Sequence, residues 1–247
     1  MIYSKVKIEY VKIVTNNHDL NNPKLVCLSD MNKICLFALL VAVASANLGA
    51  DISNLASSRQ TLNCLASQNM SRVTFEISDE RGAINKDFLN GYIFARDAGI
   101  ATVDAIVIVN DNFTSTSLSA NVTSALPASF NGTIWLRVLA SDQLWNQDVS
   151  KRISYLETLV LAFKQRGVKA GVYSDANAWA AVFGTPYAGS DTLKAVPVWY
   201  ANDNGVQNFD DFDYAGFGTW TQPSLKSYQK YAYLCYTTIT SLNFYKV

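Results

Sequence analysis

The alternation of short β-rich apolar runs with helical patterns constrains the fold of this chain most. The clearest run is TVDAIVIV at residues 102–109, which is typical of a strand buried on both faces. Because strands that alternate with helices pair in parallel through right-handed crossovers, the pattern predicts an α/β barrel or open sheet. Its site is expected at the carboxyl ends of the strands. We predict the other strands at 73–77, 133–139, 168–173 and 195–201, and helices at 85–98, 150–166 and 175–183.

The last third of the chain carries few helical signals and is predicted to form turns and short strands around Trp220 and Tyr228. No internal repeat or linker is evident, so a single domain is expected. Apolar residues make up 49% of the chain and charged residues 16%, which provides a buried core and argues against disorder. The formal net charge of zero argues against a nucleic-acid partner, which would require a basic excess.

The N-terminal region has the order of a secretory signal peptide at residues 31–46. Met31-Asn32-Lys33 is followed by an apolar run and then by the small residues Ala44-Ser45-Ala46. The apolar run from 34 to 46 is short, since a membrane span needs about 20 residues; the alternative is a buried core helix. Residues 1–30 are then an upstream extension, either untranslated if Met31 is the true start or part of an unusually long leader. The mature domain, 47–247, is expected to be a monomer outside the cell or in the phagosomal–lysosomal lumen, with no membrane segment.

Two further features fit an oxidising, secretory environment. Only Cys64 and Cys235 remain after cleavage, so a single disulfide between them is expected; two buried free thiols are the alternative. Four Asn-x-Ser/Thr triplets are predicted glycosylation acceptors, although such triplets also arise by chance. They begin at Asn69, Asn112, Asn121 and Asn131.

Residues 47–247 contain no histidine, because the chain's one histidine is His18. This excludes a Ser-His-Asp or Cys-His apparatus and any metal site that needs imidazole. We expect no cofactor and no metal, so any hydrolytic chemistry must rely on carboxylates.

Several stretches resemble the lysozymes of glycoside hydrolase family 25, in particular their nematode and protist branch. GADIS at 49–53 resembles the family's opening strand, and AGIATVD at 98–104 a helix-to-strand passage. GVYS at 171–174 matches another segment, and PVWYA at 197–201 begins the longest match. The order and spacing of these pieces cover nearly all of 47–245, together with Trp179, Phe183-Gly184, Phe209, Phe212, Phe217-Gly218, Trp220 and Pro223. The resemblance implies a modified TIM-like β/α barrel of eight strands, (β/α)5(β)3, whose later part loses its helices.

The resemblance also implies a catalytic strand reading roughly Trp-x-Asp-x-Glu. Residues two apart on a strand share a face, so both acids would point into the cleft. The Glu of the family acts as general acid, and its acidic partner stabilises the oxocarbenium-like centre or orients the substrate. Here Trp135 is kept, but Arg137 and Leu139 occupy the Asp and Glu positions, and neither can act as a general acid. A late acid of the family aligns with Ser241.

The residual cleft carboxylates are Asp51, which matches a family acid, and Asp104, which is shared with the nematode-like branch. The alternative for Asp51 is a turn or cap residue. Asp104 lies within an apolar strand, where an unpaired carboxylate is costly. We therefore hypothesise that Arg137 forms a salt bridge with Asp104 or Asp51. A relocated acid could come from the loops at Asp142 or at Asp210, Asp211 and Asp213, although solvated loop residues are the simpler interpretation.

Aromatic residues offer a second kind of site. Trp199, Tyr200 and Trp220 could stack on sugar rings or pack in the core, and the sequence favours neither. Trp145 and Trp179 are assigned to packing.

The sequence thus predicts a secreted lysozyme-like protein that has lost catalytic power. It would retain peptidoglycan or related glycan binding, or act as an interaction module in immunity or feeding. One alternative is an active muramidase that uses Asp51 and a relocated acid. Another is a structural secreted domain without glycan affinity.

Overall fold

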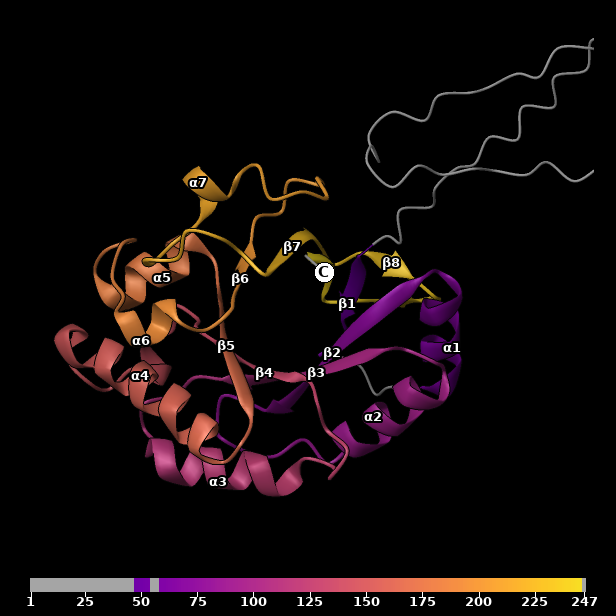
Figure 1. The fold of residues 1–247 in the computed structure, drawn as a ribbon, viewed down its shortest axis with the longest axis horizontal. Coiled ribbons are helices and arrows are strands. Elements are labelled where there is room, and N and C mark those ends of the chain that lie inside the picture. Colours follow the sequence, from indigo (N-terminus) through magenta and orange to yellow (C-terminus); the bar gives the residue numbers. More distant parts are fainter. Residues whose placement is uncertain (1–46, 54–57, 246–247) are drawn as a thin grey trace, which may run out of the picture. The chain divides into compact units, whose positions relative to one another are not determined.

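The computed structural model describes residues 47–53 and 58–245, so the predictions for residues 1–30 and 31–46 lie outside the described part. Eight strands close into a barrel in the order β1-β10-β7-β6-β5-β4-β3-β2 (Figure 1). The barrel strands are β1 (Leu48–Asp51), β2 (Met70–Ser78), β3 (Thr102–Ile108), β4 (Thr133–Arg137), β5 (Lys169–Ser174), β6 (Val198–Ala201), β7 (Leu225–Lys230) and β10 (Ser241–Tyr245).

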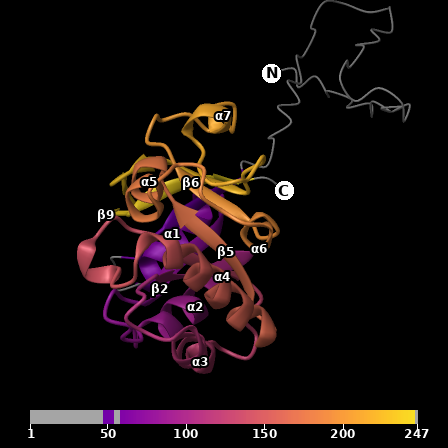
Figure 2. The same cartoon turned by 90° about the vertical axis from the view of Figure 1, so that its left-hand side faces the viewer.

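Seven neighbouring strands, β1 to β7, run parallel, and β10 closes the barrel antiparallel to both β1 and β7. Helices connect the first six strands and cover the outside of the barrel (Figure 2), whereas β7 and β10 have no long helix between them. The helices are α1 (Arg59–Ser67), α2 (Phe88–Asp97), α3 (Ser115–Ala125), α4 (Val149–Gln165), α5 (Ala176–Phe183), α6 (Asp191–Lys194) and α7 (Phe212–Ala215), with a 3-10 turn, η1 (Asp142–Leu144). The predicted (β/α)5(β)3 barrel is confirmed.

Local sequence signals set the helix boundaries that the chain pattern predicts. Asp175 caps α5 by accepting a hydrogen bond from the backbone N–H of Ala178 at 2.8 Å. Gly99 and Gly167 follow α2 and α4 with φ of 82° and 75°, a left-handed conformation that glycine adopts without steric cost. The strands and helices predicted from periodicity are all present, with boundaries shifted by a few residues.

Two longer helices, α1 and α3, were not predicted, and neither were the four-residue helices α6 and α7. The sequence of α3, STSLSANVTSA, is rich in serine and threonine, which favour turns and caps over helix interiors. The helix forms because Leu118 and Val122 are buried on one face against the barrel. Tertiary packing thus overrides a weak local preference.

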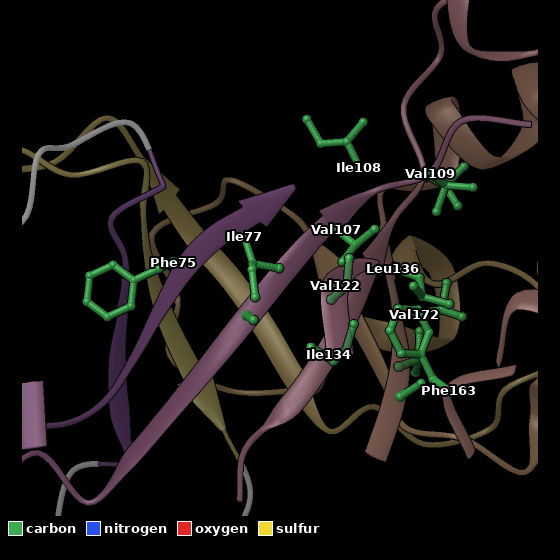
Figure 3. Close-up of a cluster of buried hydrophobic side chains, with 14 of the residues drawn as sticks. Phe75, Ile77, Val107, Ile108, Val109, Val122, Ile134, Leu136, Phe163 and Val172 are labelled. Atoms are coloured by element: carbon green, nitrogen blue, oxygen red, sulfur yellow. The ribbon is translucent and has the colours of Figure 1, made fainter. Parts of the chain in front are cut away.

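The core has two layers, separated by the strands. The outer layer lies between the strands and the helices, where Val122 of α3 and Phe163 of α4 pack near Val107, Ile134 and Val172 (Figure 3). Alternate residues face inward and fill the barrel with Ile106, Trp135, Tyr173, Trp199 and Leu225. The barrel interior is therefore a packed core.

The N-terminal end of the barrel is sealed by a buried ion pair. Asp104 is completely buried and lies 2.6 Å from an Nη of Arg72 on β2. Its carboxylate also accepts hydrogen bonds from Thr133 N and Trp135 Nε1, both at 2.9 Å. The guanidinium of Arg72 lies 4.7 Å from the ring centroid of Tyr245. These contacts satisfy the carboxylate that the sequence places inside an apolar strand.

A short hairpin, β8 (Tyr233–Leu234) and β9 (Thr237–Thr238), connects β7 to β10. Its turn residue Cys235 forms a disulfide with Cys64 of α1, with the two Cα atoms 5.6 Å apart. The pairing agrees with the prediction and ties the start of the domain to its end. No helix within 47–53 and 58–245 has the length and apolar character of a membrane span.

Removing the disulfide should destabilise the domain strongly. The bond spans a sequence separation of 171 residues. Constraining so long a loop of the unfolded chain contributes about 5 kcal/mol in the chain-entropy model. We expect Cys64→Ser with Cys235→Ser to lower the free energy of unfolding by several kcal/mol in urea titrations. An unchanged midpoint, with disulfide formation in the parent verified by mass spectrometry, would contradict this.

Breaking the ion pair at the N-terminal end should also be costly, because it leaves Arg72 partly buried without a counter-charge. We expect Asp104→Asn to lower the free energy of unfolding by about 3 kcal/mol. The matched control is Asp97→Asn, which removes the partner of Arg59 in a pair whose side chains are both about half exposed. That change should cost less than about 1 kcal/mol. Equal losses in chemical denaturation would refute the distinction.

Candidate functional site

Four inward-facing residues gather at the C-terminal end of the barrel, which we call the barrel mouth. Asp51 is the last residue of β1, Glu76 lies near the end of β2, Arg137 is the last residue of β4, and Tyr173 lies near the end of β5. Because side chains alternate along a strand, Glu76 shares the inward face with Thr74, and Arg137 with Trp135. The barrel mouth therefore combines two carboxyl groups with one guanidinium.

Asp51 is completely buried. Its Oδ1 accepts hydrogen bonds from the backbone N and the hydroxyl of Ser53, at 3.0 and 2.5 Å. Its Oδ2 has no hydrogen-bond partner within the described residues. Burial raises the pKa of Asp51 above its usual range, even though Arg137 and the Ser53 hydrogen bonds act to lower it. The predicted site carboxylate is thus at the barrel mouth, although it is covered from solvent.

Glu76 is the acid that sequence analysis missed. Desolvation by burial raises the pKa of Glu76 to about 7, against a lowering influence of Arg137 and a further raising influence of Asp51. At neutral pH this partly exposed carboxyl group exists in both protonation states, as a general acid or base requires. The signal was available in the sequence, because Arg72, Thr74 and Glu76 alternate with the apolar residues Val73, Phe75 and Ile77.

Arg137 does not form the salt bridge that we hypothesised. No ion pair of Arg137 is found within the described residues, and Asp104 pairs instead with Arg72. The guanidinium lies 5.2 Å from the ring centroid of Tyr173. Burial lowers the pKa of Arg137, but Tyr173, Asp51, Glu76 and Tyr231 raise it more strongly in sum, so the side chain is cationic.

Asp104 also lies outside the candidate site, contrary to the prediction. Its contact with the backbone of Thr133, the first residue of β4, places it at the N-terminal end of the barrel. The sequence indicates on which face of a strand Asp104 lies, and this led to the prediction of a cleft carboxylate. The height of Asp104 along the barrel axis depends on the stagger of the strands, which the sequence does not indicate.

The other two departures from the family pattern lie near the barrel mouth. Leu139 follows the end of β4 and is partly buried against the outer core. Ser241 begins β10, is paired in register with Asp51, and is buried. Its hydroxyl group lies 2.9 Å from that of Ser227 and accepts from the side-chain amide nitrogen of Asn243 at 3.0 Å. Neutral hydrogen-bonding groups therefore surround Ser241, the position that the resemblance aligns with the family's late acid.

The three aromatic residues considered for sugar stacking are buried. Trp199 fills the barrel interior, with its ring stacked 4.0 Å from that of Tyr173. Tyr200 is fully buried and donates to Asp211 at 2.5 Å. Trp220 packs edge-on to Trp179 and donates to a backbone carbonyl. All three residues therefore pack in the core, as Trp145 and Trp179 also do.

The loop acids do not supply a replacement at the barrel mouth. Asp142, Asp210 and Asp213 are exposed to solvent. Asp211 is buried, but it lies 2.9 Å from Lys226 Nζ and accepts hydrogen bonds from Tyr200, Asn202 and Asn204. These contacts hold the loop after β6 and lower the pKa of Asp211, although its burial acts in the opposite direction. Asp211 therefore has a structural role.

Two other predictions concern modification and metals. All four predicted glycosylation acceptors, Asn69, Asn112, Asn121 and Asn131, are exposed. The side-chain amide of Asn112 is already hydrogen-bonded, since it donates to Asn110 and to Gln143 O.

Among the residues the structure describes, no group of three His, Cys, Asp or Glu side chains could hold a metal ion.

Comparisons with known proteins agree on one family. The family model of lysozyme-like protein 1 matches residues 42–228. Probable GH family 25 lysozyme 4 of Dictyostelium discoideum is 31% identical over 196 residues, covering 78% of this chain and 87% of that protein. The structure of the muramidase from Trichobolus zukalii superposes with a TM-score of 0.64 at 12% identity, covering 82% of this chain and 94% of that one. The autolysin LytC of Streptococcus pneumoniae, solved with a synthetic peptidoglycan ligand, gives a TM-score of 0.59 at 12% identity, with coverage of 80% and 46%.

The raised pKa of Glu76 predicts a specific pH dependence of stability. Since the pKa is about 7 in the folded chain and 4.5 when unperturbed, the folded state binds more protons between these values. Stability from this group is therefore lost as pH rises from about 4.5 to about 7. Glu76→Gln should flatten this part of the pH profile of Tm, whereas Asp142→Asn, at an exposed loop acid, should not. Parallel profiles for the parent and Glu76→Gln would contradict the assignment.

Proposed function

Because the chain belongs to the glycoside hydrolase family 25 lysozymes, we propose that it is a secreted lysozyme-like protein that binds peptidoglycan without hydrolysing it by the family's mechanism. Secretion rests on the signal pattern at residues 31–46, outside the described part, and on the Cys64–Cys235 disulfide, a bond typical of oxidising compartments. A role in defence or feeding is the corresponding biological setting.

The cationic Arg137 at the barrel mouth carries this proposal. Glycoside hydrolysis needs one carboxyl group to protonate the leaving oxygen and a second to stabilise positive charge at the sugar. A guanidinium at the central position destabilises an oxocarbenium-like centre by charge repulsion, and it has no proton to give at physiological pH. Leu139 and Ser241 remove two further acids. The loss therefore concerns charge and proton transfer, while the barrel itself is retained.

The polar groups left at the barrel mouth support glycan binding. Arg137 offers hydrogen-bond donors, while the partly exposed Glu76 offers acceptors, and sugar hydroxyl and acetamido groups can use both. The related muramidases and the LytC autolysin share this fold, and the LytC autolysin forms a complex with a synthetic peptidoglycan ligand. Peptidoglycan glycan is accordingly the proposed ligand.

Glu76 favours a second candidate, an active muramidase with a relocated acid. Its pKa of about 7 would let the protonated carboxyl group donate to the glycosidic oxygen at neutral pH. Asp51, once ionised, would then stabilise the developing positive charge or attack the sugar. Arg137 beside both carboxyl groups opposes this reaction, which is why we rank it second.

A turbidity assay on purified bacterial cell walls separates the two candidates. Under the leading proposal, the secreted protein clears the suspension no faster than a heat-inactivated sample. Arg137→Asp with Leu139→Glu should also remain inactive, because Ser241 still lacks the late acid. Clearing by the parent that Glu76→Gln abolishes, but Asp142→Asn does not, would establish the active enzyme instead.

Cosedimentation with insoluble peptidoglycan tests the binding half of the proposal. The parent protein should sediment with the polymer. Arg137→Gln should weaken retention, since it removes a charged fork of donors at the barrel mouth, whereas Arg81→Gln, at an exposed arginine, should not. A parent protein that stays in the supernatant would be a structural domain without glycan affinity, and the proposal would fail.

A further inference from the structure

The hairpin between β7 and β10 carries a cluster of exposed tyrosine side chains, which we call the tyrosine hairpin: Tyr231, Tyr233 and Tyr236. Their side chains are 72%, 74% and 84% exposed. Large aromatic rings at such exposure are unusual, since burying them would stabilise the fold. They are not loosely placed, because Ala232 and Ile239 beneath them are buried in the core.

The exposure of these rings follows from the register of the hairpin. Tyr233 pairs with Thr238 in the β8–β9 ladder, and side chains alternate between its faces. Ala232 and Leu234 therefore face the core, while Tyr231 and Tyr233 face outward. Tyr236 lies in the turn. The outward face thus presents phenol rings over an apolar support.

The backbone of the hairpin holds conformations that tyrosine does not favour. Four non-glycine residues have positive φ within the described residues, and Tyr231, Cys235 and Tyr236 are three of them, at 52°, 54° and 62°. The two-residue turn at Cys235 and Tyr236 normally carries asparagine and glycine. Such strain persists where the surrounding structure enforces it, and it concentrates at binding sites. Here the Cys64–Cys235 disulfide supplies the anchor.

The hairpin is directly connected to the barrel mouth. Thr240 N donates to Asp51 O at 2.8 Å, and Tyr231 N donates to Thr240 O at 3.0 Å. Figure 1 shows β8 next to the end of β1. Tyr231 is also one of the groups whose charge acts on Arg137. The hairpin therefore adjoins the barrel mouth, through these backbone hydrogen bonds and through the proximity of Tyr231 to Arg137.

We propose that the tyrosine hairpin is the aromatic platform on which a peptidoglycan glycan chain lies as it reaches the barrel mouth, an inference that rests on the proposed function. The apolar C–H faces of pyranose rings stack on aromatic rings, and the phenol hydroxyl groups can bond to sugar hydroxyl groups. Anchoring by the disulfide reduces the conformational entropy lost on binding. The platform takes the role that Trp199, Tyr200 and Trp220 cannot fill, since they are buried.

Nitration footprinting of the intact protein tests this placement without any mutation. Tetranitromethane modifies exposed tyrosine rings, and mass spectrometry locates each modified residue. With purified insoluble peptidoglycan present, we expect nitration of Tyr231, Tyr233 and Tyr236 to fall at least threefold. Tyr187, which is 79% exposed between α5 and α6, is the internal control and should not change. Binding without protection of the hairpin tyrosines would overturn the platform while leaving the proposed function intact.

A variant provides the second measurement. Tyr231→Gly, Tyr233→Gln and Tyr236→Gly remove the rings, and glycine suits the two positions with positive φ. We expect the apparent Kd for peptidoglycan to rise at least tenfold, with an unchanged circular dichroism spectrum, whereas Tyr187→Gln should leave it unchanged. Parent-like affinity of the triple variant would refute the platform. A parent protein that does not bind peptidoglycan would overturn both the platform and the proposed function.

Discussion

The antiparallel strand β10 is the element on which the rest of the structure depends. Without it, β1 and β7 would expose unpaired backbone groups, and the barrel would be an open sheet. Its register places Ser241 opposite Asp51 and so fixes what lies at the barrel mouth. Because the chain must turn around to enter β10, a hairpin necessarily forms at that end. Barrel closure, the polar groups of the mouth and the tyrosine hairpin are thus consequences of one strand pairing.

Different residues of the barrel determine its stability and its chemistry. Outward-facing residues such as Ile134 and Leu136 are buried in the outer core, where the helices pack, and stabilise the fold. Inward-facing residues near the strand ends determine the chemistry of the barrel mouth. Arg137 illustrates the consequence, since an inward position at a strand end accepts a large cation without disturbing the outer core. The fold can therefore accept a change of charge at the barrel mouth while its outer core is kept.

Much of the fold was predictable because its signals are local. The apolar run at 102–109 became a buried strand, and glycines in a left-handed conformation follow α2 and α4 near the predicted helix ends. The helix α3 was missed because its serines and threonines carry no helical signal. In the site, Asp51 was proposed through the family resemblance. Glu76 was overlooked, although polar residues at 72, 74 and 76 alternate with apolar residues in the sequence. For Trp199, Tyr200 and Trp220 the sequence left sugar stacking and core packing open, because aromatic composition does not indicate burial.

The sequence by itself determined the alternation of strands and helices, the family, the pair of cysteines and the presence of Arg137 and Leu139 in and after the fourth barrel strand. Those properties depend on residue identity and short-range spacing. Only the tertiary structure decided that Arg72 neutralises Asp104, that Glu76 meets Asp51 and Arg137, and that three tyrosines of the hairpin face solvent. The physical reason is that charge pairing and burial depend on strand stagger and barrel closure, which bring together residues far apart in the chain.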